Sequence, residues 1–252
     1  MKKRVIISLS TKNKIVDLKK EEFIDFITKK LNPKRYEFCH DYLTNEDYYI
    51  YSSESKKKEQ NSTFDPWERV FDLYYSKING SPVSTNDTSV WIDSDTNKPI
   101  PKFEMEEWVQ KTVSNIKRFL NPKSRILEVG CGNGLILEKL IHHVDMYIGI
   151  ETSKHAIESI KNSSIWKENK NKIKLFNLSA IELFKLKYSN FDFIIINSVC
   201  QYFPDLEYLI DVLSQLGSKL KTNSFVYIGD VRSYELSNIQ YIERSKYNAE
   251  LR

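Results

Sequence analysis

Glycine is scarce in this chain of 252 residues, with only seven, and three of them fall within five consecutive positions. The three lie in the segment Glu128-Val129-Gly130-Cys131-Gly132-Asn133-Gly134, directly after the run Arg125-Ile126-Leu127. A glycine-poor chain that gathers glycines at the end of a strand lets its backbone approach a ligand there. The segment is therefore the first candidate binding loop.

Cysteine and long apolar runs are equally sparse, and each shortage excludes a class of protein. The three cysteines, Cys39, Cys131 and Cys200, lack the spacing of metal ligands, so the sequence predicts no metal site. Their odd number predicts free thiols in a reducing cytoplasm. No apolar run is long enough to cross a membrane, and residues 5–7 are too short for the core of a secretory signal. We therefore expect a soluble, cytoplasmic protein.

Neither sign of charge dominates, because 38 basic and 34 acidic residues leave a formal net charge of +4. A nucleic-acid surface usually needs a concentrated basic face or stripe. The short run Lys56-Lys57-Lys58 is more typical of a solvated linker. The sequence therefore predicts no nucleic-acid partner.

The residues that flank the loop indicate its ligand. A carboxyl group at Glu128 argues against a dinucleotide, because it would repel the pyrophosphate. The dinucleotide fingerprint also needs a glycine at position 135, where this chain has Leu135. S-adenosylmethionine carries no phosphate, and its α-ammonium and sulfonium are cations that a carboxylate attracts. We interpret the segment as an S-adenosylmethionine loop.

A second acid supports this interpretation. Glu151 ends the apolar run Met146-Tyr147-Ile148-Gly149-Ile150 and lies 21 residues after Gly130. In βαβ nucleotide-binding units an acid at that distance accepts hydrogen bonds from ribose hydroxyls. Alone it would be more typical of a solvated strand end, but the glycine loop upstream favours the ribose.

Strand-like and helix-like segments alternate around the loop, which is typical of an α/β fold with a doubly wound, mostly parallel, Rossmann-like sheet. The predicted strands cover residues 125–129, 146–150, 173–178, 191–196 and 225–228, and the predicted helices 135–141, 154–160 and 205–220. The continuous apolar run over 191–196 predicts a strand buried on both faces.

The chain divides at about residue 60. Residues 1–60 are expected to form a small N-terminal extension and linker, with a strand at 5–9, a helix at 19–31 and a polar linker from residue 52. The main domain is expected over 61–252, where apolar stripes predict a helix at 67–75 and another after Pro101. The stripe at 67–75 fits plain core packing equally well.

Three further motifs accompany the loop: Asn197-Ser198-Val199-Cys200-Gln201-Tyr202-Phe203-Pro204, Gly229-Asp230-Val231-Arg232-Ser233, and Pro99-Ile100-Pro101 with Met105 and Trp108. Together these segments resemble the class I S-adenosylmethionine-dependent methyltransferases, and within them the methyltransferase domains inserted in nonribosomal peptide synthetases. The resemblance runs from about residue 67 to residue 233. It implies an enzyme, S-adenosylmethionine as the methyl donor, and a peptidyl carrier protein that presents the substrate on phosphopantetheine.

Two departures from the family pattern stand out. The family pattern resembles Trp-Asn-Ser-Ser-Tyr-Thr-Gly where this chain has Trp91-Ile92-Asp93-Ser94-Asp95-Thr96-Asn97, so Asp95 replaces a tyrosine that is expected to close over the donor. The family sheet also ends in an antiparallel hairpin, and residues 236–252 are predicted to form one polar helix instead. Either the chain is a fragment, or a partner or another segment covers the exposed edge.

Ligands of open α/β sheets bind at the carboxyl ends of the strands, and these positions supply the expected donor site. We expect Glu128 and the loop residues Gly130, Cys131, Gly132 and Gly134 to hold the methionine part, Glu151 and Thr152 the ribose, and Ser179 and Ala180 the adenine. Asn197 and Ser198 are expected to bind the methionyl carboxylate or ammonium, and Gln201 to complete the site on the side that faces the incoming acceptor.

The acceptor side is expected to favour nitrogen. A neutral amine attacks a methyl group without a strong base, whereas a hydroxyl needs its proton removed, and no histidine lies in the predicted strands of the site. We expect Asp230 to orient the amine and receive its proton, Arg232 to pair with it or to bind an acyl or phosphopantetheine group, and Tyr202 to face the acceptor. A plain Asp230–Arg232 salt bridge is an equally weighted alternative.

Three functions stay open. The leading one is N-methylation of a carrier-bound aminoacyl or peptidyl thioester in nonribosomal peptide biosynthesis. The second is a stand-alone small-molecule N- or O-methyltransferase of secondary metabolism, and the third is a catalytically weak, donor-binding remnant or fragment. Asn197-Ser198-Val199-Cys200 lacks the two prolines that usually follow the fourth strand in enzymes that methylate base amines, which again argues against nucleic acid.

Overall fold

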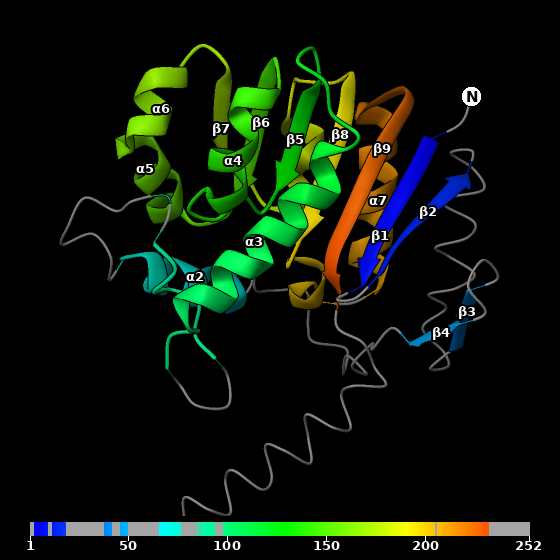
Figure 1. Cartoon of the computed structure of the whole chain (residues 1–252), viewed down its shortest axis with the longest axis horizontal. Coiled ribbons are helices and arrows are strands. Elements are labelled where there is room, and N and C mark those ends of the chain that lie inside the picture. Colours follow the sequence, from blue (N-terminus) through cyan, green and yellow to red (C-terminus); the bar gives the residue numbers. More distant parts are fainter. Residues whose placement is uncertain are drawn as a thin grey trace, which may run out of the picture.

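The computed structural model describes residues 3–9, 12–18, 38–41, 46–49, 66–76, 85, 87–93, 98–204 and 206–231. Within them, seven strands form one sheet in the order β2-β1-β9-β8-β5-β6-β7 (Figure 1). The strands are β1 (Lys3–Leu9), β2 (Lys12–Leu18), β5 (Arg125–Val129), β6 (Met146–Glu151), β7 (Ile173–Asn177), β8 (Phe191–Asn197) and β9 (Leu220–Val231). A separate two-stranded sheet pairs β3 (Phe38–Asp41) with β4 (Glu46–Tyr49).

Five of these strands form the parallel, doubly wound sheet that the sequence predicts. From β5 the chain runs outward through β6 and β7, then returns to the other side of β5 with β8 and β9. The strand order therefore reverses between β5 and β8, which is where ligands of this fold bind at the carboxyl ends of the strands. The two strands that carry Glu128 and Asn197 flank this point.

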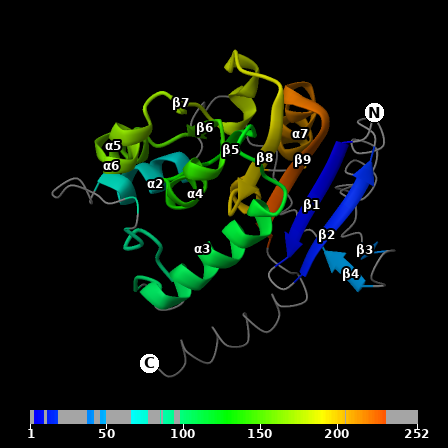
Figure 2. The same cartoon turned by 45° about the horizontal axis from the view of Figure 1, so that its top comes forward.

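Helices cover both faces of the sheet (Figure 2). One face packs on α3 (Lys102–Lys117), α4 (Leu135–Leu140), α5 (Lys154–Asn162) and α6 (Ser164–Asn169), and the other on α7 (Leu206–Lys219) and a 3₁₀ helix at Ala180–Lys185. The buried strand β8 shows why both faces are needed. Its Phe193 and Ile195 lie in the first core, and Ile194 and Ile196 lie in the second.

The two helices predicted before the loop are confirmed as α2 (Pro66–Ser76) and α3. Met105, Val109 and Ile116 lie on the buried side of α3, at the spacing that the sequence indicated. The apolar stretch after β7 forms a 3₁₀ helix. The short helix α6 and the strands β2, β3 and β4 were not predicted, because each is too short or too polar to carry a clear periodicity.

The exposed edge expected beside the fifth strand is covered by the beginning of this same chain. Strand β1 pairs in parallel with β9, from Arg4 opposite Phe225 to Leu9 opposite Val231. Strand β2 folds back antiparallel on β1 and becomes the edge. The alternative that another segment covers this edge is therefore confirmed, and among the described residues that segment is β1 with β2 rather than a partner or a missing part of the chain. The domain boundary at residue 60 stays a prediction.

Several predicted segments lie outside the described residues: the helix at 19–31, the linker from residue 52, residues 94–97 with Asp95, Arg232, and the polar helix at 236–252. Among the helices that are described, none has the length and apolar character needed to cross a lipid bilayer.

Candidate donor and acceptor site

The glycine loop connects β5 to α4 through backbone conformations that a side chain would strain. Gly130 and Gly132 have φ angles of 72° and 52°. A Cβ atom at Gly130 would lie 2.5 Å from Val199 Cγ2, and one at Gly132 would lie 2.8 Å from Tyr75 Oη. Both conformation and contact therefore require glycine here.

The loop uses its own N–H groups within the chain. Gly130 and Cys131 both donate to the carbonyl oxygen of Ile150, at 2.8 and 3.1 Å, and Gly132 donates to Glu151 Oε2 at 2.9 Å. These donors are the groups that a phosphate-binding loop offers to its ligand. The N–H groups of all three residues are thus engaged within the chain, and this pattern suits a ligand without phosphate. That the loop holds the methionine part stays a prediction.

Glu151 holds the loop from the end of β6. Its buried carboxylate accepts the Gly132 N–H on Oε2, and on Oε1 it accepts the Ser153 N–H at 3.0 Å and the Thr152 hydroxyl at 3.2 Å. A carboxylate has about four acceptor positions. One position is left for a ribose hydroxyl, and the long Thr152 bond is the easiest to exchange for a second.

Glu128 is a buried carboxyl group in β5, only 3% exposed, and Tyr147 Oη donates to its Oε2 at 2.5 Å. Burial raises the pKa of Glu128 to about 8; the Tyr147 hydrogen bond opposes the rise and the charge of Glu151 adds to it. The ligand-free chain therefore holds Glu128 mostly protonated at pH 7. A cation beside it would favour the ionised form.

Ser198 and Asp230 meet at the ends of β8 and β9. Both have left-handed backbones, with φ angles of 58° and 55°. The Ser198 hydroxyl donates to Asp230 Oδ2 at 2.5 Å, and the Ser198 N–H donates to the Gly229 carbonyl at 3.1 Å. Such conformations cost about 1–2 kcal/mol each outside glycine and concentrate at functional sites.

Two side-chain carbonyls in this region are buried without a hydrogen-bond partner among the described residues, namely Asn197 Oδ1 and Gln201 Oε1. Asn197 is 6% exposed, and its carbonyl lies over Gly229, where any Cβ atom would collide with it. An unsatisfied buried acceptor costs about 1–3 kcal/mol. A ligand that brings N–H groups would satisfy both oxygens.

The predicted adenine residues adjoin Glu151, because the Leu178 N–H donates to the Glu151 carbonyl at 3.1 Å. Ser179 caps the following 3₁₀ helix, and its N–H and hydroxyl both donate to Glu182 Oε2 at 3.0 Å. Its side chain is thus engaged within the chain. The adenine prediction now rests on the backbone near Ala180.

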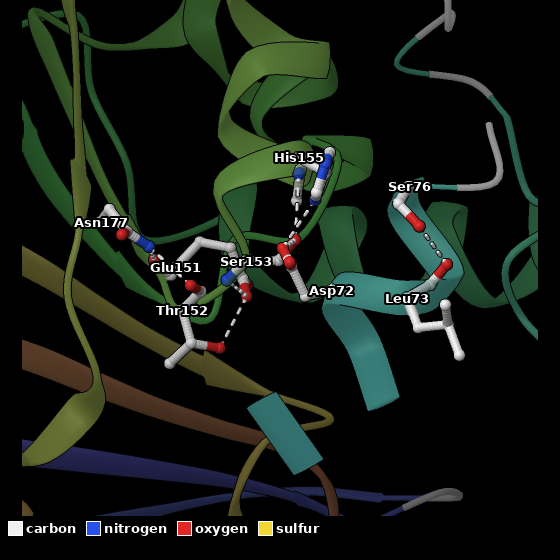
Figure 3. Close-up of polar contacts among 9 residues, drawn as sticks. Asp72, Leu73, Ser76, Glu151, Thr152, Ser153, His155 and Asn177 are labelled. Atoms are coloured by element: carbon white, nitrogen blue, oxygen red, sulfur yellow. Dashed lines mark hydrogen bonds and ion pairs between the residues drawn. The ribbon is translucent and has the colours of Figure 1, made fainter. Parts of the chain in front are cut away.

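Helix α2 is a part of the site that the sequence did not assign (Figure 3). Asp72 Oδ1 accepts the Ser153 hydroxyl at 2.7 Å and lies 2.9 Å from His155 Nδ1, and we call these three residues the α2 latch. Burial raises the pKa of Asp72, but the hydrogen bonds from Ser153 and His155 lower it by more, so the net shift is downward. Because Ser153 caps α5 two residues after Glu151, the latch fixes α2 beside Glu151.

The same helix places aromatic side chains at the loop. Tyr75 is 4% exposed, with its hydroxyl over Gly132. Burial raises the pKa of Tyr75 well above its usual value, opposed by a hydrogen bond with the Asn133 backbone. The Phe71 ring packs edge-on against Tyr202 at 5.0 Å between centroids. The aromatic stripe was visible in the sequence, but its neighbours lie far along the chain.

Cys131 fills space in the loop. A Cβ atom added at Gly149 would lie 2.8 Å from Cys131 Sγ. Burial raises the pKa of the Cys131 thiol well above its usual value. A redox role gains no support from this environment. Among the described residues, no three histidine, cysteine or acidic side chains are grouped to hold a metal ion.

The described residues fit a donor that is cationic and lacks phosphate. The loop offers no spare N–H groups to an anion at Gly130, Cys131 or Gly132, and two buried acids, Glu128 and Glu151, flank it. Asn197 and Gln201 add unpartnered acceptors, which suit ammonium or amine hydrogens.

Comparison with known proteins agrees with this chemistry. A family model described as "Methyltransferase domain" matches residues 120–251. The chain is 35% identical over 176 residues to the probable non-canonical nonribosomal peptide synthetase CymA of Salinispora arenicola, covering 69% of this chain and 2% of that protein. It is 33% identical over 186 residues to the nonribosomal peptide synthetase TES of Alternaria alternata, covering 71% of this chain and 4% of that protein.

The chain thus spans only a few per cent of the length of these curated relatives. Among solved structures, one described as "DhpI-SAM-HEP complex" is similar with a TM-score of 0.49 and 12% identity, covering 72% of this chain and 73% of that one.

Proposed function

The chain belongs to the class I S-adenosylmethionine-dependent methyltransferases, and from this we propose that it methylates an amine nitrogen of an aminoacyl or peptidyl thioester held on a carrier protein. The observation that carries the nitrogen assignment is the pair of buried, unpartnered carbonyls of Asn197 and Gln201. Carbonyl oxygens accept hydrogen bonds but donate none, and two such acceptors suit an amine, which brings two N–H groups, better than a hydroxyl, which brings one O–H. The similarity to nonribosomal peptide synthetases supports a carrier-bound substrate.

On the donor side, this chain's residues bind and orient. Glu151 would accept the ribose hydroxyls, and Glu128, once ionised, would attract the cationic methionine part. Tyr75 and the α2 latch would hold helix α2 over the loop and keep water away. When bound, S-adenosylmethionine supplies a methyl carbon already activated by its sulfonium, so alignment is the main task left to the protein.

On the acceptor side, Asn197 and Gln201 would hold the amine by its N–H bonds, with the nitrogen lone pair facing the methyl carbon. The Ser198 hydroxyl already donates to Asp230, so its oxygen remains able to accept a proton from the amine. As the new carbon–nitrogen bond forms, the nitrogen becomes positively charged and keeps its two hydrogens. One of these would leave its carbonyl partner for the Ser198 oxygen, while Ser198 passes its own proton to Asp230. This gives Ser198 a role in the acceptor step rather than in donor binding.

The test compares methyl acceptors that differ only in the nucleophilic atom, nitrogen or oxygen, or only in whether they are attached to the carrier protein. The purified chain is incubated with isotopically labelled S-adenosylmethionine and a carrier protein loaded with a panel of aminoacyl groups, and products are located by mass spectrometry. Matched controls are the α-hydroxyacyl thioesters on the same carrier and the free amino acids. We expect the amine thioester to react at least about a hundredfold faster than its hydroxyl analogue.

The alternatives are distinct outcomes of this experiment. Equal turnover of free and carrier-bound amino acids would favour a stand-alone small-molecule enzyme. Faster reaction of the hydroxyacyl thioester would overturn the nitrogen assignment. Donor binding without turnover of any acceptor would favour the remnant.

A further inference from the structure

Strand β1 pairs with β9 on both sides of Asp230. The two strands are in step from Arg4 opposite Phe225 to Ser8 opposite Gly229. The next residue of β1, Leu9, pairs with Val231, so the register shifts by one at this point. Asp230 is therefore the extra residue of a β-bulge, directly at the acceptor site.

The bulge determines where Asp230 points. Its backbone is left-handed, with a φ angle of 55°, and its carboxylate reaches across to the Ser198 hydroxyl of the neighbouring strand end. On the β8 side the register is regular from Phe193 opposite Phe225 to Asn197 opposite Gly229. Bulges bend a strand and re-aim side chains, and they are frequent beside active sites. A regular β9 would leave the Asp230 side chain in an ordinary pleated direction.

We propose that β1 is a positioning element of the active site: by pairing with Gly229 and Val231 it fixes the bulge that aims Asp230 at Ser198. The inference rests on the proposed function for its kinetic meaning, because Asp230 is assigned there as the proton acceptor. It gives the first residues of the chain a role in turnover, beyond covering an edge. The relevant backbone positions are those of Ile7, Ser8 and Leu9.

The test weakens the hydrogen bonds between β1 and β9. The result is compared with that of the same kind of substitution in β2, one strand further from β9. The variant is Ile7→Pro with Ser8→Pro, because successive N–H groups of a strand face alternate neighbours and one of the two faces β9. The control is Asn13→Pro with Lys14→Pro on β2, whose residues lie opposite Ser8 and Ile7. Proline is tolerated far better on an edge strand such as β2.

Three measurements are made on the full-length chain: amide exchange over residues 225–229, the dissociation constant of S-adenosylmethionine, and kcat with the carrier-bound amine. In the β1 variant we expect faster exchange, a dissociation constant within about twofold of the parent, and a kcat lower by about tenfold to a hundredfold. The β2 control should keep both its exchange and its kcat. Fast exchange with unchanged kcat, or equal losses of donor affinity and kcat, would overturn the proposal.

A spectroscopic measurement separates this proposal from the proposed function, because it needs no acceptor. The ¹³C resonance of the Asp230 carboxyl is assigned with Asp230→Asn and then followed in Ser198→Ala. In the parent chain the loss of the Ser198 hydroxyl should shift this resonance, and in the β1 variant it should not, since the contact is already gone. A shift of equal size in both backgrounds contradicts the positioning role even if the chain methylates no thioester.

Discussion

At the scale of single residues, Glu128 lowers the stability of the ligand-free chain at neutral pH, whereas in its ionised form it would favour binding of a cationic ligand. Its pKa of about 8 in the folded chain, against an ordinary value of 4.5, means that the unfolded chain ionises first. The stabilisation of the folded state by protonated Glu128 is complete below pH 4.5 and is lost progressively as the pH rises to about 8. At neutral pH the buried acid therefore destabilises the ligand-free chain.

Replacement of Glu128 with glutamine should remove this cost while keeping an acceptor for Tyr147. We expect Glu128→Gln to raise the free energy of unfolding at pH 7.5 by on the order of 3 kcal/mol and to flatten its decline between pH 5 and pH 8. Denaturant titrations across this range provide the measurement. The exposed acid Glu158 supplies the control variant Glu158→Gln, which should change neither quantity. A destabilised Glu128→Gln would contradict the assigned ionisation.

Two ligands should distinguish the role of Glu151 in binding from the role of Glu128. Glu151→Ala removes the expected ribose acceptor, so we expect both S-adenosylmethionine and methylthioadenosine to bind at least about tenfold more weakly, or 1.4 kcal/mol. Glu128→Gln should weaken S-adenosylmethionine alone, because methylthioadenosine carries no ammonium or sulfonium. Calorimetric titration of the four pairs decides this. Equal losses for both ligands in both variants would mean that the acids act only by supporting the loop.

At the scale of elements, the α2 latch attaches a helix that would otherwise contact the site through few polar groups. We expect Asp72→Ala to lower the free energy of opening of α2 by about 1 kcal/mol, since the carboxylate is partly exposed and its bonds are screened. Amide exchange over residues 69–76 should accelerate, and the donor should dissociate severalfold faster. Leu73→Ala, at an exposed position on the same helix, is the control and should change neither rate. Faster amide exchange in α2 without faster dissociation of the donor would mean that α2 does not help to retain the donor.

At the scale of the whole molecule, one sheet joins strands β1 and β2 to the candidate donor site. The strands β1 and β7 lie near opposite ends of the strand order, with the switch point between them. A donor present at a hundred times its dissociation constant should raise the free energy of unfolding by about 2.7 kcal/mol. If the described strands unfold as one unit, amides of both β1 and β7 will gain this protection. Protection of β7 alone would support the boundary at residue 60.

Local patterns were sufficient to predict the glycine loop and the position of Glu151 at the end of its strand. The loop at Gly130–Gly134 was identified because its glycines satisfy a backbone requirement that any neighbouring structure would impose, and Glu151 was identified by its fixed distance within a βαβ unit. The α2 latch was not, since Asp72 and His155 are brought together only by folding. In the sequence Asp72 has the pattern of a solvated acid and His155 lies near the start of a predicted helix, and neither feature indicates that the two residues are in contact.

By itself the sequence determined the class of fold, the five parallel strands and the position of the glycine loop, because hydrophobic periodicity and glycine conformation are local properties. Only the tertiary structure decided what covers β9, where Asp230 points, and whether Glu128 is charged. Each of these depends on pairing or burial between distant segments. Strand β1 has an ordinary apolar sequence, and its place beside β9 follows from the free edge that the rest of the sheet presents.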